Sequence, residues 1–385
     1  GADVEVRFNG ALGCPFYTRA LEPETEAFLE SLDPEAVTRR SFEVERAFER
    51  LRAADVGRGK EQLDKEGPLC CATYFCGERL SMVSLGLSHM LFDGWSYFSL
   101  LRCWDEELGN PGSSAVLEHC GLYNVTHLNP PGSRLLFQMA MGTKSRPLRE
   151  LYTVRARVRE ATLAKLKERA LETAEPGDPA ISRNDAFVAW LANILGTKVF
   201  GIMADCRGRA GVPKGAFGNA LSSWFGAPGR GPGRCGARDV RAALLQRGGA
   251  REPGLFTAFS CGADEVAQVN NWEKIQYFPS FGGKLRQSVT TLGLKRMFES
   301  SAKNTQRVLL CMPGEYQMTH WGLSSDQATR LAAAWAELGE RTVSSVSGAE
   351  VEEAMVELGI IPKPPPRPHP STQPAGSCCR RRKSA

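Results

Sequence analysis

Hydrophobic and polar positions change their period within one stretch of the chain, residues 81–108. In the first half, apolar residues stand at alternate positions, which predicts a strand with one buried face: Val83, Leu85 and Leu87. His89 continues that face at the end of the strand. In the second half, apolar residues recur at every third or fourth position, which predicts an amphipathic helix: Tyr97, Leu101, Trp104 and Leu108. The pattern therefore places a histidine where a strand meets a loop, four residues before the Asp93-Gly94 pair that begins the helix.

The same two periods predict that strands and helices are interleaved along the rest of the chain. Apolar runs and alternation predict strands at residues 4–8, 68–76, 79–89, 152–158, 198–204 and 221–225, an extended segment that starts at 14–17, a strand ending near 272, and a hairpin of 308–312 and 316–321. Helical spacing predicts helices at residues 22–32, 42–53, 161–172, 181–196, 239–246, 325–338 and 351–358. No glycine-rich phosphate loop follows any strand, so the pattern indicates an α/β protein without a dinucleotide-binding fingerprint or a Walker motif.

The length of 385 residues allows two domains, each with its own core. The sequence GTKSRP at 142–147 has the composition of a linker, so we place the boundary there. The predicted domains are residues 1–146 and 147–360. Residues 361–385 are rich in proline and then in arginine, and we expect this tail to be disordered.

Composition excludes several classes of protein. Hydrophobic residues make up 42% and charged residues 24% of the chain, as in soluble globular proteins. The net charge of +5 owes much to the tail, Arg380 to Lys383, which argues against a nucleic-acid-binding body. The twelve cysteines lack zinc spacing, so we expect no metal and reduced thiols in a cytoplasmic compartment. No apolar run is long enough to span a membrane.

The position of His89 suggests acid–base chemistry. An imidazole has an unperturbed pKa of ~6.5, so it accepts a proton near neutral pH, and a positioned general base contributes roughly 10²–10⁴-fold to a rate. The same residues have simpler explanations. A histidine beside apolar residues is often packed in a core, and an aspartate before a helix is an ordinary N-cap.

Four motifs together resemble the BAHD acyltransferases of plants and fungi, within the chloramphenicol-acetyltransferase-like superfamily. They occur in the family's order, over roughly Val4 to Leu338. The motifs are HMLFDG at 89–94, matching HxxxDG; ISRNDAFVAW at 181–190, similar to the family's Ser-x-Asn-Asp-Ala helix; DCR at 205–207 followed by FGNA at 217–220; and NW at 271–272 followed by SFGGK at 280–284, similar to DFGWGK.

This resemblance implies a two-domain α/β fold of mixed sheets flanked by helices, with an active-site tunnel between the domains. It implies an enzyme of secondary metabolism, usually monomeric, that moves an acyl group from acyl-CoA to a hydroxyl or amine of a small molecule. Acyl-CoA would be a co-substrate, with no permanently bound cofactor and no acyl-enzyme. His89 would be the general base, Asp93 would turn away and pair with Arg207, and Gly94 would let the loop approach the acceptor.

The sequence departs from the family in two places. Ser280 stands where the family has aspartate, and Gly282 and Gly283 are adjacent where the family has a tryptophan between them. We expect the family's usual first strand and helix to precede Val4, and this sequence does not include them. Residues Ser182, Gly282 and Lys284 are the candidates for contacts with CoA. Ser182 is also the predicted N-cap of helix 181–196, with Asp185 completing a capping box, and Lys284 is equally well explained as a solvated loop charge.

Other interpretations remain open. A non-catalytic binding protein with this fold would also explain the altered 280–284 loop. A condensation-type domain acting on carrier-bound acyl groups is a further alternative, although Ser88 precedes His89 where that group often has a second histidine. Asn219 either binds backbone groups of its own loop or contacts the substrate. We expect His320 to be structural.

Overall fold

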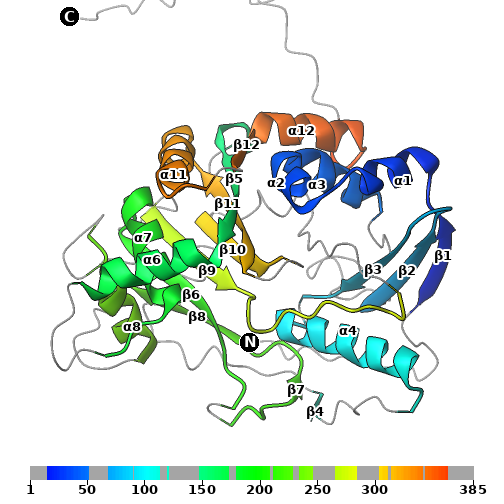
Figure 1. The fold of residues 1–385 in the computed structure, drawn as a ribbon, viewed down its shortest axis with the longest axis horizontal. Helices are drawn as coiled ribbons and strands as arrows, with labels where there is room; N and C mark the ends of the chain where they lie inside the picture. Colours follow the sequence, from blue (N-terminus) through cyan, green and yellow to red (C-terminus); the bar gives the residue numbers. More distant parts are fainter. Residues whose placement is uncertain are drawn as a thin grey trace, which may run out of the picture.

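Figure 1 shows the chain as a computed structural model. It describes residues 15–51, 68–89, 91–112, 119–120, 147–172, 179–208, 211–228, 234–245, 265–283, 303–310, 314–340 and 343–362. The strand predicted at 4–8, nearly all of the linker at 142–147 and most of the tail after 360 lie outside these residues. The described strands form one sheet of three, one of seven and a pair of short strands.

The seven-stranded sheet lies in the second half of the chain. Its strand order is β12-β5-β11-β10-β9-β6-β8. The bounds are β5 (Tyr152–Arg159), β6 (Val199–Asp205), β8 (Leu221–Gly226), β9 (Val266–Asn271), β10 (Lys303–Leu309), β11 (Glu315–Leu323) and β12 (Val343–Ser347). β9 pairs in parallel with β6 and β10, and the other neighbours are antiparallel. The sheet is therefore mixed, as the family resemblance implied.

One face of this sheet carries the main core. Four helices contribute to it: α6 (Glu160–Leu171), α7 (Arg183–Leu195), α8 (Ala237–Leu245) and α11 (Ser325–Glu337). The side chains of Val154, Ala156 and Val158 alternate along β5 and pack in one cluster with Leu163, Phe187 and Trp335. Ser182 caps α7 in a capping box with Asp185, as predicted, and Gly196 ends the helix with φ of 67°.

The other face of β5 meets helices from the start of the chain: α2 (Pro34–Arg39) and α3 (Ser41–Arg50). Arg155 of β5 forms a buried ion pair with Glu45 of α3. Ser344 of β12 donates a 2.7 Å hydrogen bond to the carbonyl of Thr38. Contacts therefore cross the boundary placed near residue 147, and the division into two domains stays a prediction. The helices α2, α3 and α12 (Gly348–Glu357) lie together in Figure 1.

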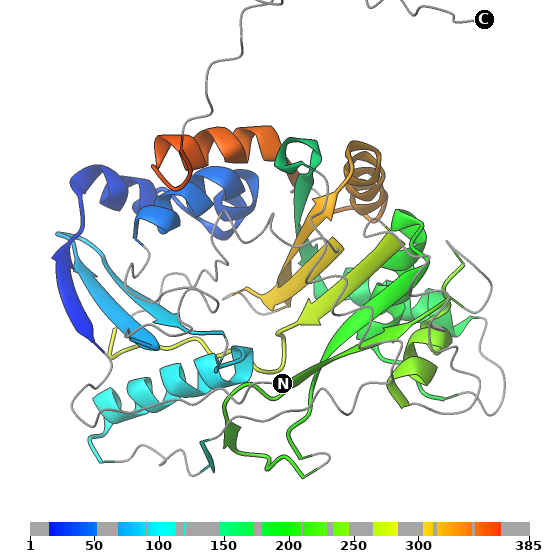
Figure 2. The same ribbon diagram turned by 180° about the vertical axis from the view of Figure 1, so that it is seen from behind.

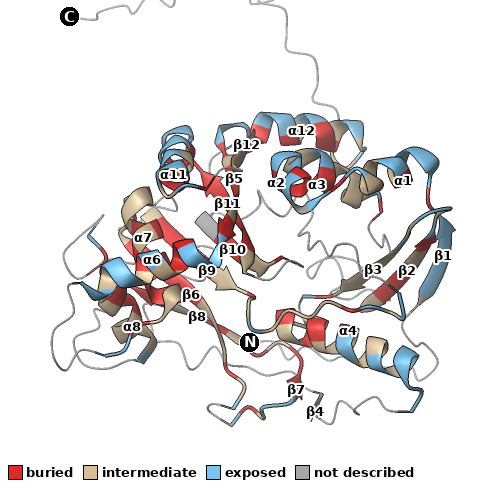
Figure 3. Ribbon diagram, viewed as in Figure 1, coloured by how far each residue is buried: buried red, intermediate tan, exposed pale blue. Residues whose placement is uncertain are grey.

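The smaller sheet and α4 lie on the opposite side of the molecule from α11 (Figures 1 and 2). The sheet comprises β1 (Phe16–Ala20), β2 (Cys70–Cys76) and β3 (Ser81–Leu87). β1 is an exposed edge strand paired in parallel with β2, and β3 is antiparallel to β2 (Figure 3). The remaining elements are α1 (Pro23–Glu30), α4 (Gly94–Gly109), a 3₁₀ turn (Leu148–Glu150) and the parallel pair β4 (His119–Cys120) and β7 (Ala216–Phe217).

Most predicted elements are confirmed, including the hairpin of β10 and β11, and their observed ends lie within five residues of the predicted ends. The predicted apolar stripe of α4 is partly wrong. Leu101 is buried, but Leu108 is 55% exposed, and Gly94, Ser96 and Phe98 supply the rest of the buried face. Helix α2 and strands β4, β7 and β12 were not predicted. Within the described ranges, no helix is long and apolar enough to cross a membrane.

Candidate active site

His89 lies in the turn between β3 and α4, and it is exposed. Strand β3 ends at Leu87. The turn is closed by hydrogen bonds from the backbone N–H groups of Leu91 and Phe92 to the carbonyl of Ser88, at 3.1 and 3.0 Å. The interpretation that His89 continues the apolar face of the strand is therefore wrong. Its exposure also excludes the packed core histidine, and it leaves the imidazole accessible to a reacting molecule.

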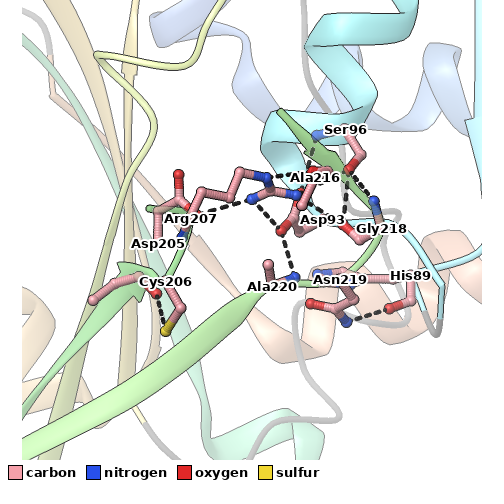
Figure 4. Close-up of polar contacts among 11 residues, drawn as sticks. His89, Asp93, Ser96, Asp205, Cys206, Arg207, Ala216, Gly218, Asn219 and Ala220 are labelled. Carbon is pink, nitrogen blue, oxygen red and sulfur yellow. Dashed lines mark hydrogen bonds and ion pairs between the residues drawn. The ribbon is translucent and has the colours of Figure 1, made fainter. Parts of the chain in front are cut away.

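Asp93 caps α4 and at the same time pairs with Arg207 (Figure 4). The guanidinium donates from Nη1 to Oδ2 at 2.8 Å and from Nη2 to Oδ1 at 3.0 Å. The backbone N–H groups of Ser96 and Ala220 donate to the same carboxylate at 3.0 and 2.9 Å. The Asp93 side chain is 0% exposed and that of Arg207 is 3% exposed. The ion pair implied by the family resemblance is thus present, buried and bidentate.

The guanidinium of Arg207 has acceptors at all three nitrogens. Nε donates to the carbonyl of Ala216 at 2.6 Å, and Nη1 also donates to Asp205 at 2.9 Å. Nη2 also donates to the carbonyl of Gly218 at 3.0 Å. The guanidinium lies over the ring of Trp95, 4.3 Å from its centre. Because this cation is buried and bonded on every side, it is a structural charge that fixes the surrounding loops.

Residues 216–220 contact both ends of the turn that carries His89. At one end, Ser96 donates from Oγ to the carbonyl of Gly218 at 2.7 Å and accepts from the Gly218 N–H at 2.8 Å. At the other end, Nδ2 of Asn219 donates to the backbone carbonyl of His89 at 3.0 Å (Figure 4). Gly218 has φ of 150°, which side-chain-bearing residues rarely adopt. The FGNA segment thus positions its neighbours through its backbone and through one amide.

Gly94 is needed for packing. A Cβ at this position would lie 3.1 Å from Cδ1 of Ile275 and 3.3 Å from Cε2 of Trp272. Trp272 in turn packs on Phe98 of α4 with their rings 5.8 Å apart. The close approach that the structure shows at Gly94 is therefore made by the chain itself. The approach of an acceptor to this position stays a prediction.

The loop after Trp272 is held on α4 by Asp105. Its carboxylate accepts hydrogen bonds from Tyr277 Oη at 2.7 Å, from the Ser280 N–H at 3.0 Å and from the Phe281 N–H. Burial opposes ionisation of Asp105, but these hydrogen bonds outweigh it and hold the pKa of the carboxyl below its ordinary value. Phe281, with φ of 47°, packs on Trp104 with their rings 4.9 Å apart. A carboxylate on α4 thus fixes the loop that contains Ser280.

The candidates for contacts with CoA come from separate elements. The hydroxyl of Ser182 accepts from the N–H of Asp185 at 3.2 Å in the cap of α7. Gly282 lies in the loop held by Asp105, with φ of 74° and open space where a Cβ would stand. Lys284 lies outside the described residues. The structure brings together His89, Asp93, Gly94 and Arg207, whereas the role of Ser182, Gly282 and Lys284 in binding stays a prediction.

His320 is fully buried, as expected for a structural residue. Trp335 donates from Nε1 to Nε2 of His320 at 3.2 Å. The hydroxyl oxygen Oγ1 of Thr305 lies 2.8 Å from Nδ1 of His320. Burial lowers the pKa of His320 to about 3, so this histidine is neutral at physiological pH.

Among the described residues, no group of three or more His, Cys, Asp or Glu side chains could hold a metal ion, and the cysteines form no disulfide with one another.

Two residues that hold the site together, Ser96 and Asp105, were not predicted from the sequence. Ser96 follows the N-cap Asp93 by three residues, a spacing that indicates an N3 position but not a side-chain bond to a distant loop. The signal for Asp105 was weaker still, because an aspartate within a helix is usually solvated. Neither contact follows from local periodicity.

Comparison with known proteins gives matches in structure. No protein-family model matches the chain, and no curated protein sequence matches it. TRI101 from F. sporotrichioides, solved with coenzyme A and T-2, has a TM-score of 0.55 and 15% identity over 86% of this chain and 81% of its own. TRI101 from F. graminearum, solved with coenzyme A and deoxynivalenol, has a TM-score of 0.56 and 12% identity over 86% and 82%. The likeness confirms the predicted fold class, a mixed α/β fold of sheets flanked by helices, which this chain shares with TRI101.

Proposed function

We propose that this protein is an acyl-CoA-dependent acyltransferase that acts on a hydroxyl or amine of a small molecule, with His89 as the general base. The observation that carries the proposal is the exposed His89 on a turn that is fixed at one end by the buried pair of Asp93 and Arg207 and at the other end by the partly buried Asn219. An accessible imidazole on a rigid frame is what general-base catalysis requires.

The similar folds support the choice of co-substrate. TRI101 was solved with coenzyme A and with small-molecule toxins. Acyl transfer from a thioester needs no nucleophile on the protein, because coenzyme A is a good leaving group. It needs a base, two aligned reactants and donors for the developing oxyanion. The motif HMLFDG supplies the base within the frame described above.

The proposed reaction balances without a cofactor. The His89 imidazole removes the proton of the acceptor as its oxygen or nitrogen attacks the thioester carbonyl. The tetrahedral intermediate collapses, the carbon–sulfur bond breaks, and the imidazolium returns the proton to the departing CoA thiolate. Asp93 takes no part in proton transfer in this scheme, because its carboxylate already accepts four hydrogen bonds away from His89.

The test is acceptor-dependent release of CoA. The protein is incubated with a panel of acyl-CoA thioesters and with pools of alcohols and amines, and free CoA is measured chromatographically. A thiol reagent is unsuitable because the chain has twelve cysteines. We expect His89→Ala to lower kcat by roughly 10²–10⁴-fold. The matched control is His369→Ala, which changes a histidine of the Pro-rich C-terminal sequence and should leave the rate unchanged.

Two results would contradict the proposal. Transfer at an undiminished rate in His89→Ala would remove His89 as the base. No release with any pair, combined with no CoA binding by calorimetry, would favour the non-catalytic binding protein that the sequence left open.

A further inference from the structure

The contact between Asn219 and His89 spans 130 residues of sequence and is the direct link from the FGNA segment to the residue that carries the imidazole. The carbonyl of Ser88 closes the turn by accepting from the N–H groups of Leu91 and Phe92. The next carbonyl, that of His89, accepts from Nδ2 of Asn219 at 3.0 Å. The amide of Asn219 thereby restrains the peptide plane that follows the His89 Cα.

Asn219 is itself held rigidly from both sides. The carbonyl of Gly218, just before it, accepts from Ser96 Oγ at 2.7 Å and from Arg207 at 3.0 Å. The N–H of Ala220, just after it, donates to Asp93 at 2.9 Å, and the carbonyl of Ala220 accepts from the Cys206 N–H at 2.9 Å. The amide is therefore presented from a backbone that is part of the buried ion-pair network (Figure 4).

We infer that Asn219 is a positioning residue for His89: its amide fixes the turn so that the imidazole points along one direction. This inference rests on the proposed function. The contact reaches the backbone carbonyl of His89 and not its imidazole, so Asn219 acts on the alignment of the ring and not on its basicity. Loss of alignment lowers the rate of proton removal while binding of both substrates is kept.

The variants that test this are Asn219→Ala and Asn219→Asp. Alanine removes the amide, and aspartate keeps its shape but places an oxygen against the His89 carbonyl oxygen. We expect either change to lower kcat by roughly 10–100-fold, the scale of misplacing a catalytic group by about 1 Å. KM for both substrates and the inflection of the pH–rate profile should stay unchanged, because the imidazole and the binding surfaces are intact.

The matched control is Asn193→Ala. Asn193 also donates from Nδ2 to a backbone carbonyl, that of Cys235, at 2.9 Å, but it does so on α7. The Asn193→Ala variant should lower thermal stability about as much as Asn219→Ala does, and it should leave kcat per folded molecule at the wild-type value. Asn219→Ala in a His89→Ala background should lower the residual rate no further, because there is no base left to align.

The inference can be overturned whether or not transfer is observed. If wild type shows transfer that depends on His89 while both Asn219 variants keep the wild-type kcat, the inference is wrong and the proposed function stands. If no variant, wild type included, catalyses transfer, the contact is tested by NMR of the histidine imidazole signals. The inference then predicts that Asn219→Ala shifts or broadens the His89 signal and not that of His320, and unchanged His89 signals overturn it.

Discussion

Asp93 and Asp105 are on one helix, twelve residues apart, and each fixes a loop from the second half of the chain. They use different chemistry. Asp93 is fully buried and accepts from a guanidinium and two backbone N–H groups. Asp105 is partly exposed and accepts from neutral donors, namely a phenol, a hydroxyl and two backbone N–H groups.

A loop held by a buried ion pair and a loop held by a carboxylate with neutral hydrogen-bond donors should respond differently to substitution. A buried charge pair tolerates no loss of one partner, because the other is left uncompensated in a low-dielectric site. A carboxylate bound by neutral groups near the surface can be replaced by an amide at a moderate cost, because water rehydrates what is released. The turn of His89 depends on the first kind, and the 277–283 loop depends on the second.

The largest effect is expected for Asp93→Asn. The side chain keeps its shape and its cap on α4, but Arg207, which is 3% exposed, loses the fully buried one of its two carboxylate partners and keeps only the partly exposed Asp205. We expect a loss of about 3–5 kcal/mol in the free energy of unfolding. Urea denaturation measures it, and Asp205→Asn is the control, since Asp205 binds the same Nη1 but is 35% exposed. Equal losses in the two variants would show that burial does not set the cost.

An intermediate effect is expected for Gly94→Ala. Gly94 directly follows Asp93 and packs against Trp272 and Ile275, which precede the loop held by Asp105. The new methyl group would meet Ile275 at 3.1 Å and Trp272 at 3.3 Å, so one of them must move. Overpacking of this kind costs roughly 1–3 kcal/mol. Gly109→Ala, at the other end of α4 with nothing within 4 Å, is the control and should be neutral or stabilising. A thermal unfolding scan of both variants compares them, and equal midpoints would contradict the packing account.

The smallest effect is expected for Asp105→Asn, about 1 kcal/mol at pH 7. Because the pKa of Asp105 is lowered on folding, its contribution is present above the unfolded-state value of ~3.9 and is lost as the pH falls through the folded value. The stability difference between wild type and Asp105→Asn should therefore shrink below a pH of about 4. A difference that persists unchanged to pH 3 would show that the carboxylate charge is not what the loop requires.

The sequence predicted the elements better than the contacts between them. Strand β3, α4 and the capped α7 follow from local periodicity and capping residues, which act within a few positions. The pairing of Asp93 with Arg207 came from a family resemblance, because no local pattern links residues 114 positions apart.

The failures have a common physical origin. His89 was placed on the apolar face of a strand because alternation does not show where pairing stops, and the strand ends at Leu87. Leu108 was expected to be buried, but tertiary packing draws on Phe98 and Ser96 instead. Strand β12 was missed because its sequence, Val343–Ser347, is mostly serine and owes its conformation to pairing with β5. In each case the deciding partner is distant in sequence.

The separation in sequence between His89 and the residues that hold its turn also sets the order in which these groups appear during synthesis. The ribosome releases the helix carrying Asp93 long before Arg207 and Asn219 exist, and about 130 residues at ~5–20 residues per second take roughly 7–26 s. Over that interval the nascent chain displays Asp93 without its counter-charge. The turn reaches its final form only when the second half arrives, so a chain truncated before residue 207 carries the histidine without the frame that orients it.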